Sequence, residues 1–395
     1  MIRKLVLFTK GIETLGFFSE QMGKAFQKLG YEVFYFDQCA EYDSFSKLLW
    51  FCEPKVTAVV SFNFDGCRGE DYMIDAKGVN FFEARQIPLI NIVVDHPFYY
   101  HKFRPYLPED YAQISIDREH EAYLKRFFPE IKRGPFLPLA GTSLWKPDTL
   151  PGWEERPLEV VFTGNYTPPS DFEHTLTRIN DEYTEFYYGI IQDFIEHPHM
   201  GMSTGIIKHL EREVEDINEE GIKECMPNMI MIDLYVRNYF RGEVVKSLVE
   251  AGVTVTCYGA GWEKLACRNP ENLIKGKSLD SLGCLQQISR AKISLNVLPW
   301  FKEGAHDRVF NSMLNGAVCV TDWSHYLQEE LKEGEEILFY ELDNREALAE
   351  QIRSLLADRE RWERLSCQGY KSAAAGHTWA DRARRIHEEI LCKIP

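Results

Sequence analysis

Short, unbroken apolar runs are the feature that most constrains how this 395-residue chain can fold. In the first third of the chain they lie at residues 5–8, 33–36, 56–62 and 89–94, and a further strand candidate lies at 113–116. Strands that are apolar at successive positions, rather than at alternate ones, are typical of a parallel sheet covered by helices on both faces. The first two runs flank a helical pattern over 13–29 that ends at Gly30, which predicts a strand–helix–strand unit.

The same pattern begins again after a segment rich in Pro and Gly at 141–157, where new apolar runs occur. They lie at 158–162, 253–258, 273–274, 293–298 and 317–321. We therefore predict an α/β protein with two Rossmann-like domains, residues 1–140 and 158–375, joined by a hinge at 141–157. Residues 170–250 are polar and helical in period, which predicts a helical insertion in the second domain. A last helix within 376–395 is expected to pack back on the first domain.

Composition limits the partners of such a chain. With 45 Lys and Arg against 61 Asp and Glu, its formal net charge is −16, which argues against general binding of nucleic acid or of an anionic membrane. The apolar runs are too short for a membrane helix, and Lys10 interrupts the first run before a signal-peptide core can form, so we expect no integral membrane segment. The 10 cysteines are scattered singly, which indicates reduced thiols and a cytoplasmic protein.

A polar, Gly-containing loop that leads into a helix is the strongest functional signal. Residues 303–306 precede a helical pattern that starts near Asp307 and closes at Gly316. The free N–H groups and partial positive charge of a helix N-terminus suit a diphosphate, and Arg308 adds a fork of donors there. In open α/β sheets ligands bind at the carboxyl ends of the strands, so two facing domains predict a site in the cleft between them.

This segment, E-G-A-H-D-R-V-F-N-S-M-L-N-G-A-V-C-V-T-D at 303–322, resembles the nucleotide-sugar domain of GT-B glycosyltransferases, in particular the CgeB-like (spore-maturation type) group. The resemblance extends to V-F-T-G-N-Y at 161–166, to V-T-V-T-C-Y-G-A-G-W at 253–262 and to H-T-W-A-D-R-A at 377–383, so it covers most of 158–390. It implies a GT-B arrangement and transfer of a sugar, of the hexosyl class, from a nucleotide diphosphate sugar, with a uridine donor expected by family habit.

Retaining members of these families carry two glutamates separated by seven residues in this segment. The resemblance implies that Glu303 faces the donor sugar and that Asn311 stands where the second glutamate would hold the ribose. An amide can bind a ribose diol but lacks the charge of a carboxylate, so the retaining or inverting course stays open. His306 and Asp307 are expected at the helix start beside the diphosphate.

Further donor-binding residues are expected at the strand ends of the second domain. Glycine lets the backbone approach a phosphate or a base, and tight turns without a ligand are the alternative explanation. Arg237 and Arg241 lie one helical turn apart and could reach the phosphates, although an exposed or ion-paired helix face is the more common use of such a pair. The donor-binding candidates at the strand ends are Gly164, Asn165, Gly259, Gly261, Lys277 and Ser278.

In the first domain, V-D-H-P-F at 94–98 ends a buried run and resembles a turn of the domain that accompanies this nucleotide-sugar domain. A carboxylate beside an imidazole at a strand's carboxyl end can accept a proton from an acceptor hydroxyl, so Asp95 and His96 are the candidate catalytic residues there. The alternative is structural, with Asp95 capping the next turn and His96 packing in the core. The rings at 98–100 could line a sugar site or belong to the core.

Other chemistries lack their motifs. The sequence has no D-x-D metal handle, no zinc spacing, no G-x-S-x-G and no P-loop, and the first turn lacks G-x-G-x-x-G. We predict a metal-independent transferase with no cofactor besides its donor, acting on a protein, a glycan or a small molecule. A catalytically silent nucleotide-sugar or glycan binding protein is the alternative, and an epimerase of nucleotide sugars is a third hypothesis.

Overall fold

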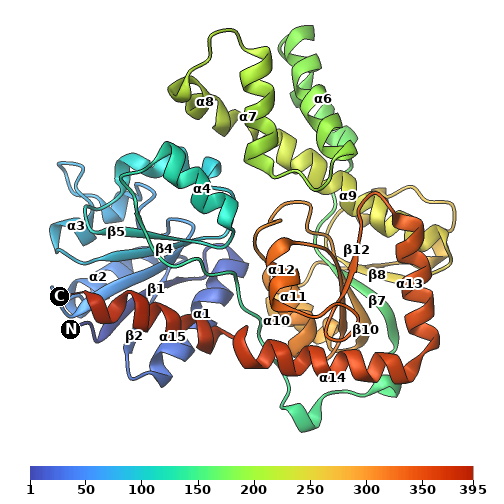
Figure 1. Cartoon of the computed structure of the whole chain (residues 1–395). Coiled ribbons are helices and arrows are strands. Elements are labelled where there is room, and N and C mark those ends of the chain that lie inside the picture. The colour runs from blue at the N-terminus through green and yellow to red at the C-terminus, as the bar shows by residue number, and fades with distance from the viewer. Residues whose placement is uncertain (395) are drawn as a thin grey trace. The chain divides into compact units, whose positions relative to one another are not determined.

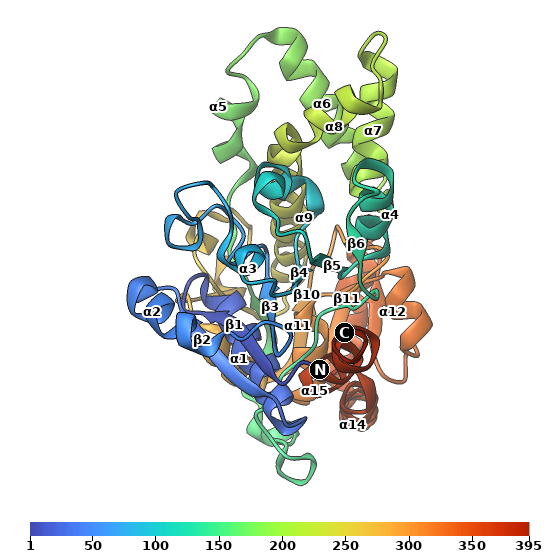
Figure 2. The same ribbon diagram turned by 90° about the vertical axis from the view of Figure 1, so that its left-hand side faces the viewer.

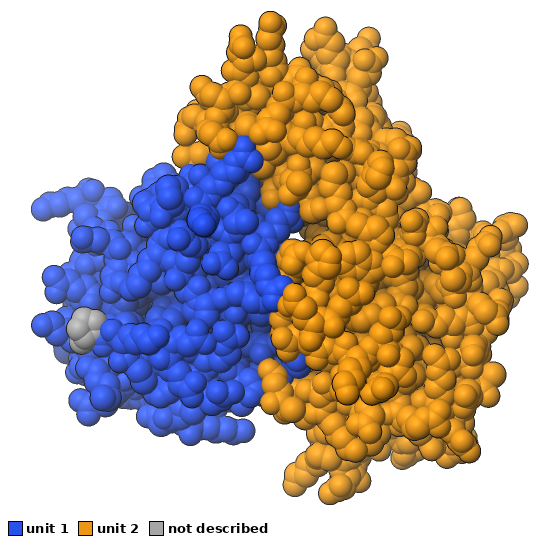
Figure 3. Space-filling view, in the orientation of Figure 1, with its two compact units in different colours: residues 1–140, 377–395 blue, residues 141–376 orange. Residues whose placement is uncertain are grey.

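The computed structural model describes residues 1–394, which form two compact units. Unit 1 comprises residues 1–140 together with 377–395, and unit 2 comprises residues 141–376; Figure 3 colours them separately. Each unit contains a six-stranded sheet in which every strand pairing is parallel.

The sheet of unit 1 has the order β2-β1-β3-β4-β5-β6. The middle strands β3, β4 and β5 are buried at every position, which is why apolar residues dominate β3 and β4 without alternating with exposed polar ones. In register, Phe62 of β3 lies beside Ile92 of β4, so the loops that follow these two strands are neighbours. The strands are β1 (Lys4–Thr9), β2 (Glu32–Asp37), β3 (Thr57–Phe62), β4 (Leu89–Val93), β5 (Tyr111–Ser115) and β6 (Lys132–Arg133).

Helices cover the sheet of unit 1. They are α1 (Glu13–Lys28), α2 (Glu41–Phe51), α3 (Phe81–Ala84), α4 (Arg118–Phe127) and α15 (Trp379–Glu389), with the 3₁₀ segment η2 (Pro97–Tyr106) after β4. Helix α1 buries Leu15, Phe18, Met22 and Phe26, which recur at helical spacing. It is followed by Gly30, whose φ of +92° is in the left-handed region that glycine adopts without strain.

The helix nearest the C-terminus, α15, belongs to unit 1 and lies beside α1 (Figures 1 and 2). Thr378 and Asp381 form a reciprocal capping box at its start, so the helix begins where the sequence places it. The ring of Trp379 packs on Phe18 at 5.0 Å between centroids, and the buried Arg382 donates to the carbonyl of Pro138 at 2.6 Å. These contacts attach the end of the chain to the first sheet.

The sheet of unit 2 has the order β12-β11-β10-β7-β8-β9. Its strands are β7 (Leu158–Thr163), β8 (Val255–Tyr258), β9 (Leu273–Gly276), β10 (Ala291–Asn296), β11 (Val318–Asp322) and β12 (Leu338–Tyr340). Its helices outside the insertion are α10 (Ser281–Ile288), α11 (Asp307–Leu314), α12 (His325–Glu330), α13 (Arg345–Ala357) and α14 (Arg359–Gly376). The sequence did not predict the edge strands β6 and β12, because two and three residues are too few for a periodic pattern.

Between β7 and β8 the chain forms only helical and irregular structure within the described residues. The helices are α5 (Glu173–Leu176), α6 (Asp181–Glu196), α7 (Met202–Glu213), α8 (Glu219–Cys225) and α9 (Ile230–Glu250). Helices α6, α7 and α8 project away from the sheet of unit 2, whereas α9 runs back along it to β8 (Figure 1). The predicted helical insertion is therefore confirmed, and its last helix is also the crossover between two neighbouring strands.

None of the helices in residues 1–394 combines the length and the apolar character needed to cross a bilayer.

Candidate functional site

The start of α11 lies at the carboxyl end of the unit 2 sheet. Val309, Phe310 and Met313 are buried, and Ser312 Oγ donates to Ser294 Oγ on β10 at 2.7 Å. These contacts hold the helix against the sheet through its middle and leave its first turn at the strand ends. Within the described residues, the N-cap residue His306 makes no side-chain capping bond, so the first-turn N–H groups are not used by that side chain.

Three arginines gather at this point from two helices. Arg237 and Arg241 lie on α9, and Arg308 is the second residue of α11. Arg237 forms a double hydrogen bond with the buried carboxylate of Asp233, with Nε to Oδ1 at 2.9 Å. Arg241 donates through Nη1 to the carbonyl of Asn165 at 3.0 Å. Arg237 therefore has an ion-pair partner on its own helix.

The other two arginines are not fully satisfied. The Nε atoms of Arg241 and Arg308 are buried and have no hydrogen-bond partner within residues 1–394. Burial lowers the pKa of Arg241, and repulsion from Arg308 and then Arg237 adds to that shift. Burial also lowers the pKa of Arg308, with Asp307 opposing and Arg237 adding. Guanidinium groups stay charged in proteins, so this crowding leaves positive charge that a bound anion would offset.

His306 lies beside the arginines with its charge suppressed. Burial is the largest cause of the lowered pKa of its imidazole, a hydrogen bond with Asp307 opposes it, and Arg308 lowers it further. Its ring meets that of Phe301 edge to face, at 4.5 Å between centroids. A neutral imidazole at this position can donate to or accept from a ligand through one nitrogen each.

The predicted sugar-facing residue, Glu303, lies in the loop before α11. Its Oε1 contacts Nδ1 of His325, the first residue of α12. Its side chain is 34 % exposed, so it remains accessible to a ligand. The contact joins the loop after β10 to the loop after β11.

Asn311 uses its amide inside the fold. Its Oδ1 accepts the backbone N–H of Thr142 at 2.8 Å, and its Nδ2 donates to Oδ2 of Asp307 at 2.9 Å. The amide therefore attaches residue 142 to α11 and orients a first-turn carboxylate. Its assignment to the ribose stays a prediction, and this geometry gives the side chain a structural role as well.

The glycines at the ends of β7 and β8 are explained by close packing of two turns. A Cβ on Gly261, whose φ is +92°, would lie 1.8 Å from the carbonyl oxygen of Tyr166, and one on Gly259 would lie 2.3 Å from that of Gly164. Asn165 joins the same turns, because its Oδ1 accepts the N–H of Ala260 at 2.9 Å. These contacts favour the tight-turn explanation, and they place Asn165 against Arg241 through its carbonyl.

Lys277 and Ser278 are not brought to this group. They follow β9, the edge strand that β7 and β8 separate from β10, and both are exposed. The structure thus brings together Arg308, His306, Asp307 and the turn at 164–165, and leaves residues 277–278 apart. Arg241 is the residue of this group that the sequence undervalued, because an arginine on a helix is most often at an exposed face.

In unit 1 the two candidate catalytic residues differ sharply. His96 is 2 % exposed, its Nδ1 accepts the N–H of Phe98 at 3.3 Å, and its ring packs against Tyr123 and His120. Burial lowers the pKa of His96 well below its usual range. His96 therefore both caps the next turn and packs in the core. The structural alternative from the sequence assigns the cap to Asp95 and the packing to His96. Asp95 remains partly exposed at the strand end.

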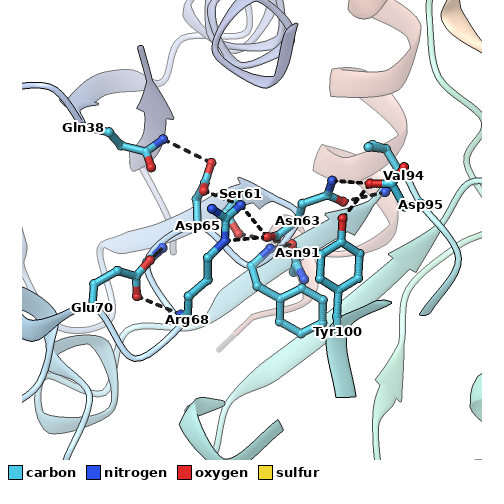
Figure 4. Close-up of polar contacts among 12 residues, drawn as sticks. Gln38, Ser61, Asn63, Asp65, Arg68, Glu70, Asn91, Val94, Asp95 and Tyr100 are labelled. Atoms are coloured by element: carbon cyan, nitrogen blue, oxygen red, sulfur yellow. Dashed lines mark hydrogen bonds and ion pairs between the residues drawn. The ribbon is translucent and has the colours of Figure 1, made fainter. Parts of the chain in front are cut away.

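Asp95 belongs to a polar network at the carboxyl ends of β3 and β4 (Figure 4). It accepts from Asn63 and Tyr100, while the backbone carbonyl of Asn63 accepts from Arg68, which also pairs with the buried Asp65 at 2.7 Å. The sequence analysis missed Asn63, Asp65 and Arg68. The signal was present as polar residues directly after the buried run 56–62, but it does not show which of them turn toward Asp95.

Metal ligands are not assembled in the described part of the chain. Among residues 1–394, no group of three or more His, Cys, Asp or Glu side chains has the geometry to hold a metal ion. All ten cysteines, each within those residues, are free thiols.

Comparison with known protein families gives a match over part of the chain. Residues 240–388 match a protein family described as glycosyl transferase-like. Comparison with curated protein sequences gives no match. The matched segment contains Arg241, Glu303 and the whole of α11.

Solved structures resemble the entire chain. Sucrose-phosphate synthase from Thermosynechococcus elongatus aligns with a TM-score of 0.51 and 10 % identity over 99 % of each chain. An alpha-glucosyltransferase in complex with UDP-glucose and DNA containing an abasic site aligns with 0.54 and 12 % over 99 % of this chain and 100 % of that one. HepE from Anabaena, in complex with UDP and glucose, aligns with 0.51 and 9 % over 99 % and 100 %. The chain therefore has the fold of the GT-B glycosyltransferases, with a glycosyl transferase-like segment at residues 240–388.

Proposed function

We propose that this protein is a glycosyltransferase that moves a sugar from a nucleotide diphosphate sugar, expected to be a UDP-sugar, to an acceptor hydroxyl without a metal ion. The fold and the match at residues 240–388 support the class of reaction. Solved structures of similar fold hold UDP or UDP-glucose, which supports the donor. The acceptor, a protein, a glycan or a small molecule, is left open, and the ten free thiols fit a reducing, cytoplasmic compartment.

The observation that carries the proposal is the pair Arg241 and Arg308. The two guanidinium groups repel each other, and each has a buried Nε–H without a partner in residues 1–394. A diphosphate would satisfy those donors and offset the repulsion. The N-terminus of α11 adds N–H groups of the same polarity at that place. The positive charge of the two arginine side chains would stabilise the leaving diphosphate in place of a metal ion.

The roles follow from these positions. As the bond between the anomeric carbon and the diphosphate oxygen breaks, Arg308, Arg241 and the start of α11 stabilise the leaving diphosphate. Glu303, held by His325, orients the sugar. The acceptor oxygen bonds to the anomeric carbon, and its proton passes to Asp95. We leave His96 out of this step, because its imidazole is buried and its Nδ1 is used in the turn.

Nucleotide affinity tests the diphosphate assignment. A charge-assisted hydrogen bond contributes about 1.5–3 kcal/mol, so Arg308→Ala should weaken UDP binding by about tenfold to a hundredfold in calorimetry. Arg241→Ala should do the same. Arg268→Ala is the matched control, because Arg268 lies in the same unit, is largely exposed and pairs with Glu250. Unchanged UDP affinity in both Arg308→Ala and Arg241→Ala would contradict the assignment.

A catalytically silent nucleotide-sugar or glycan binding protein is the second candidate. Asn311 favours it, because an amide stands where the related enzymes have a glutamate and this amide is already used in the fold. Binding of a nucleotide sugar in a thermal-shift panel, with neither hydrolysis nor transfer by the purified protein, would support the silent protein. Release of UDP in the presence of an acceptor would exclude it.

A further inference from the structure

The two oxygens of the Asp95 carboxylate have different surroundings (Figure 4). Oδ2 accepts from Nδ2 of Asn63 at 2.9 Å and from the hydroxyl of Tyr100 at 2.6 Å. Oδ1 has no hydrogen-bond partner within residues 1–394. The network therefore saturates one oxygen and leaves the other available, with the plane of the carboxylate set by two donors.

The amide of Asn63 can face Asp95 in only one orientation. The backbone N–H of Val94 donates to Asn63 Oδ1 at 2.9 Å, and a backbone N–H can only donate. The atom facing Val94 must therefore be the oxygen, so the Nδ2 donor faces Asp95. A flipped amide would lose both hydrogen bonds at once.

The backbone that presents Asn63 is strained and held from several sides. Asn63 and Phe64 have φ of +44° and +69°, a left-handed pair of non-glycine residues. Nε and Nη2 of Arg68 both donate to the carbonyl of Asn63, at 2.9 and 2.7 Å, and the N–H of Phe64 donates to Asn91 Oδ1 at 3.0 Å. Such strain persists where the surroundings over-determine it, which is common at functional sites.

Tyr100 is fixed as a donor. Its ring packs on Phe64 at 5.0 Å between centroids, which sets the direction of the hydroxyl. Burial, followed by the nearby charge of Asp95, raises the pKa of Tyr100 far above its usual value. The phenol therefore keeps its proton at any working pH and donates it to Asp95 in a constant geometry.

We propose that Asn63 and Tyr100 are positioning residues that aim Oδ1 of Asp95 at the acceptor hydroxyl, and that Arg68 keeps Asn63 in the conformation this requires. The inference rests on the proposed function, since it assigns a task to the acceptor-side carboxylate. It goes beyond that function by naming which oxygen takes the proton and which residues hold it. Neither residue is placed in contact with the substrate.

Tyr100→Phe tests the proposal, because it removes one donor and keeps the ring. We expect the transfer kcat to fall by about tenfold, the loss of one hydrogen bond to a charged group, with KM for the donor and UDP affinity within twofold of wild type. The fall in kcat with KM and UDP affinity kept is the decisive readout, because a loss of folded structure would also lower UDP affinity and thermal stability.

Tyr106→Phe is the matched control. Tyr106 ends the same segment η2, is 40 % exposed, and its hydroxyl makes no hydrogen bond within residues 1–394. Arg68→Lys is the second variant should Tyr100→Phe unfold on thermal melting. It keeps the charge beside Asp65 but cannot supply two donors to the carbonyl of Asn63, so the same fall in kcat with unchanged KM and UDP affinity is expected.

The outcomes distinguish a failure of the positioning role from a failure of the proposed function. If the wild type transfers sugar while Tyr100→Phe and Arg68→Lys match Tyr106→Phe in kcat and KM, the positioning role is overturned and the transferase stands. If the wild type transfers no sugar to any acceptor, the proposed function and the positioning role fall together.

Discussion

The carboxyl ends of the two parallel sheets have different strand orders and opposite electrostatics. In unit 1, the network around Asp95, Asn63 and Arg68 pairs each charged group with donors or with a counter-ion (Figure 4). In unit 2, Arg241 and Arg308 repel each other and keep donors without partners in residues 1–394. One end is already organised around a carboxylate, while the other holds two arginines whose Nε donors lack a partner in residues 1–394.

The difference shows that the fold does not set the chemistry of a strand end. Parallel sheets with short loops bring polar residues together at that edge, and the side chains decide whether those residues satisfy one another. Polar groups that satisfy one another in the free protein contribute to its stability. Donors without a partner contribute only when a molecule binds to them, so mutations at the two ends should separate stability from binding.

Lys302→Met should give the largest effect, because it breaks a complete contact in unit 2. Lys302 Nζ lies 2.7 Å from Asp322 Oδ2, and the two side chains are 6 % and 0 % exposed. Removing one partner leaves a buried charge without compensation, which costs about 3–5 kcal/mol. Urea unfolding should show this loss of stability. The double variant Lys302→Met/Asp322→Asn should recover part of this stability. A Lys302→Met variant as stable as wild type would show that the ion pair with Asp322 does not stabilise the fold.

Asp65→Asn should change how stability depends on pH. Burial is the main reason that the pKa of Asp65 is raised from 3.8 to about 6, with Arg68 opposing and Glu70 adding. Because the folded pKa is the higher one, the native state binds more protons between those values, and wild-type stability falls as pH rises through that window. The asparagine variant lacks this effect.

The stability of Asp65→Asn relative to wild type should therefore increase from pH 4 to pH 7 by up to about 3 kcal/mol. Urea unfolding at intermediate pH values measures this difference. Below pH 4 both forms carry a neutral side chain, so the difference should level off there. A difference that stays constant with pH would mean that Asp65 is ionised throughout, and that the unit 1 network is less enclosed than its 3 % exposure implies.

Arg241→Met should have the smallest effect on the free protein, and the direction is informative. The substitution removes the hydrogen bond to Asn165 and also removes repulsion from Arg308, so the two changes should nearly cancel, to within about 1 kcal/mol. Thermal melting without ligand should show little change, while the stabilisation by added UDP should shrink. A loss of more than about 2 kcal/mol in the free protein would make Arg241 a structural residue and weaken the contrast between the two ends.

The main elements could be predicted from the sequence because their signals are local. Fully buried strands such as β3 and β4 consist mainly of apolar residues, and α1 repeats its apolar residues at helical spacing. The edge strands β6 and β12 could not, since two or three residues have no period. The presence of a helical insertion was predictable from the scarcity of strand-like runs between β7 and β8.

The site was predictable only in part. His306, Asp307 and Arg308 lie at a helix start that the sequence predicts, so they could be identified as candidates from the sequence. Arg241 could not be distinguished from an exposed helix residue, because its burial depends on where α9 lies relative to β7 and α11. His96 and Asp95 are adjacent in the chain, yet one is enclosed by rings and the other remains accessible.

By itself the sequence determined two parallel α/β sheets, a helical insertion between the first two strands of the second sheet, and a helix start whose residues are those expected beside a diphosphate. Only the tertiary structure decided which polar groups satisfy one another and which stay incomplete. The reason is physical: secondary structure follows from short-range periodicity and turn residues, whereas burial and hydrogen bonding join residues far apart in the chain, as Asn63 joins Asp95 and Arg241 meets Asn165.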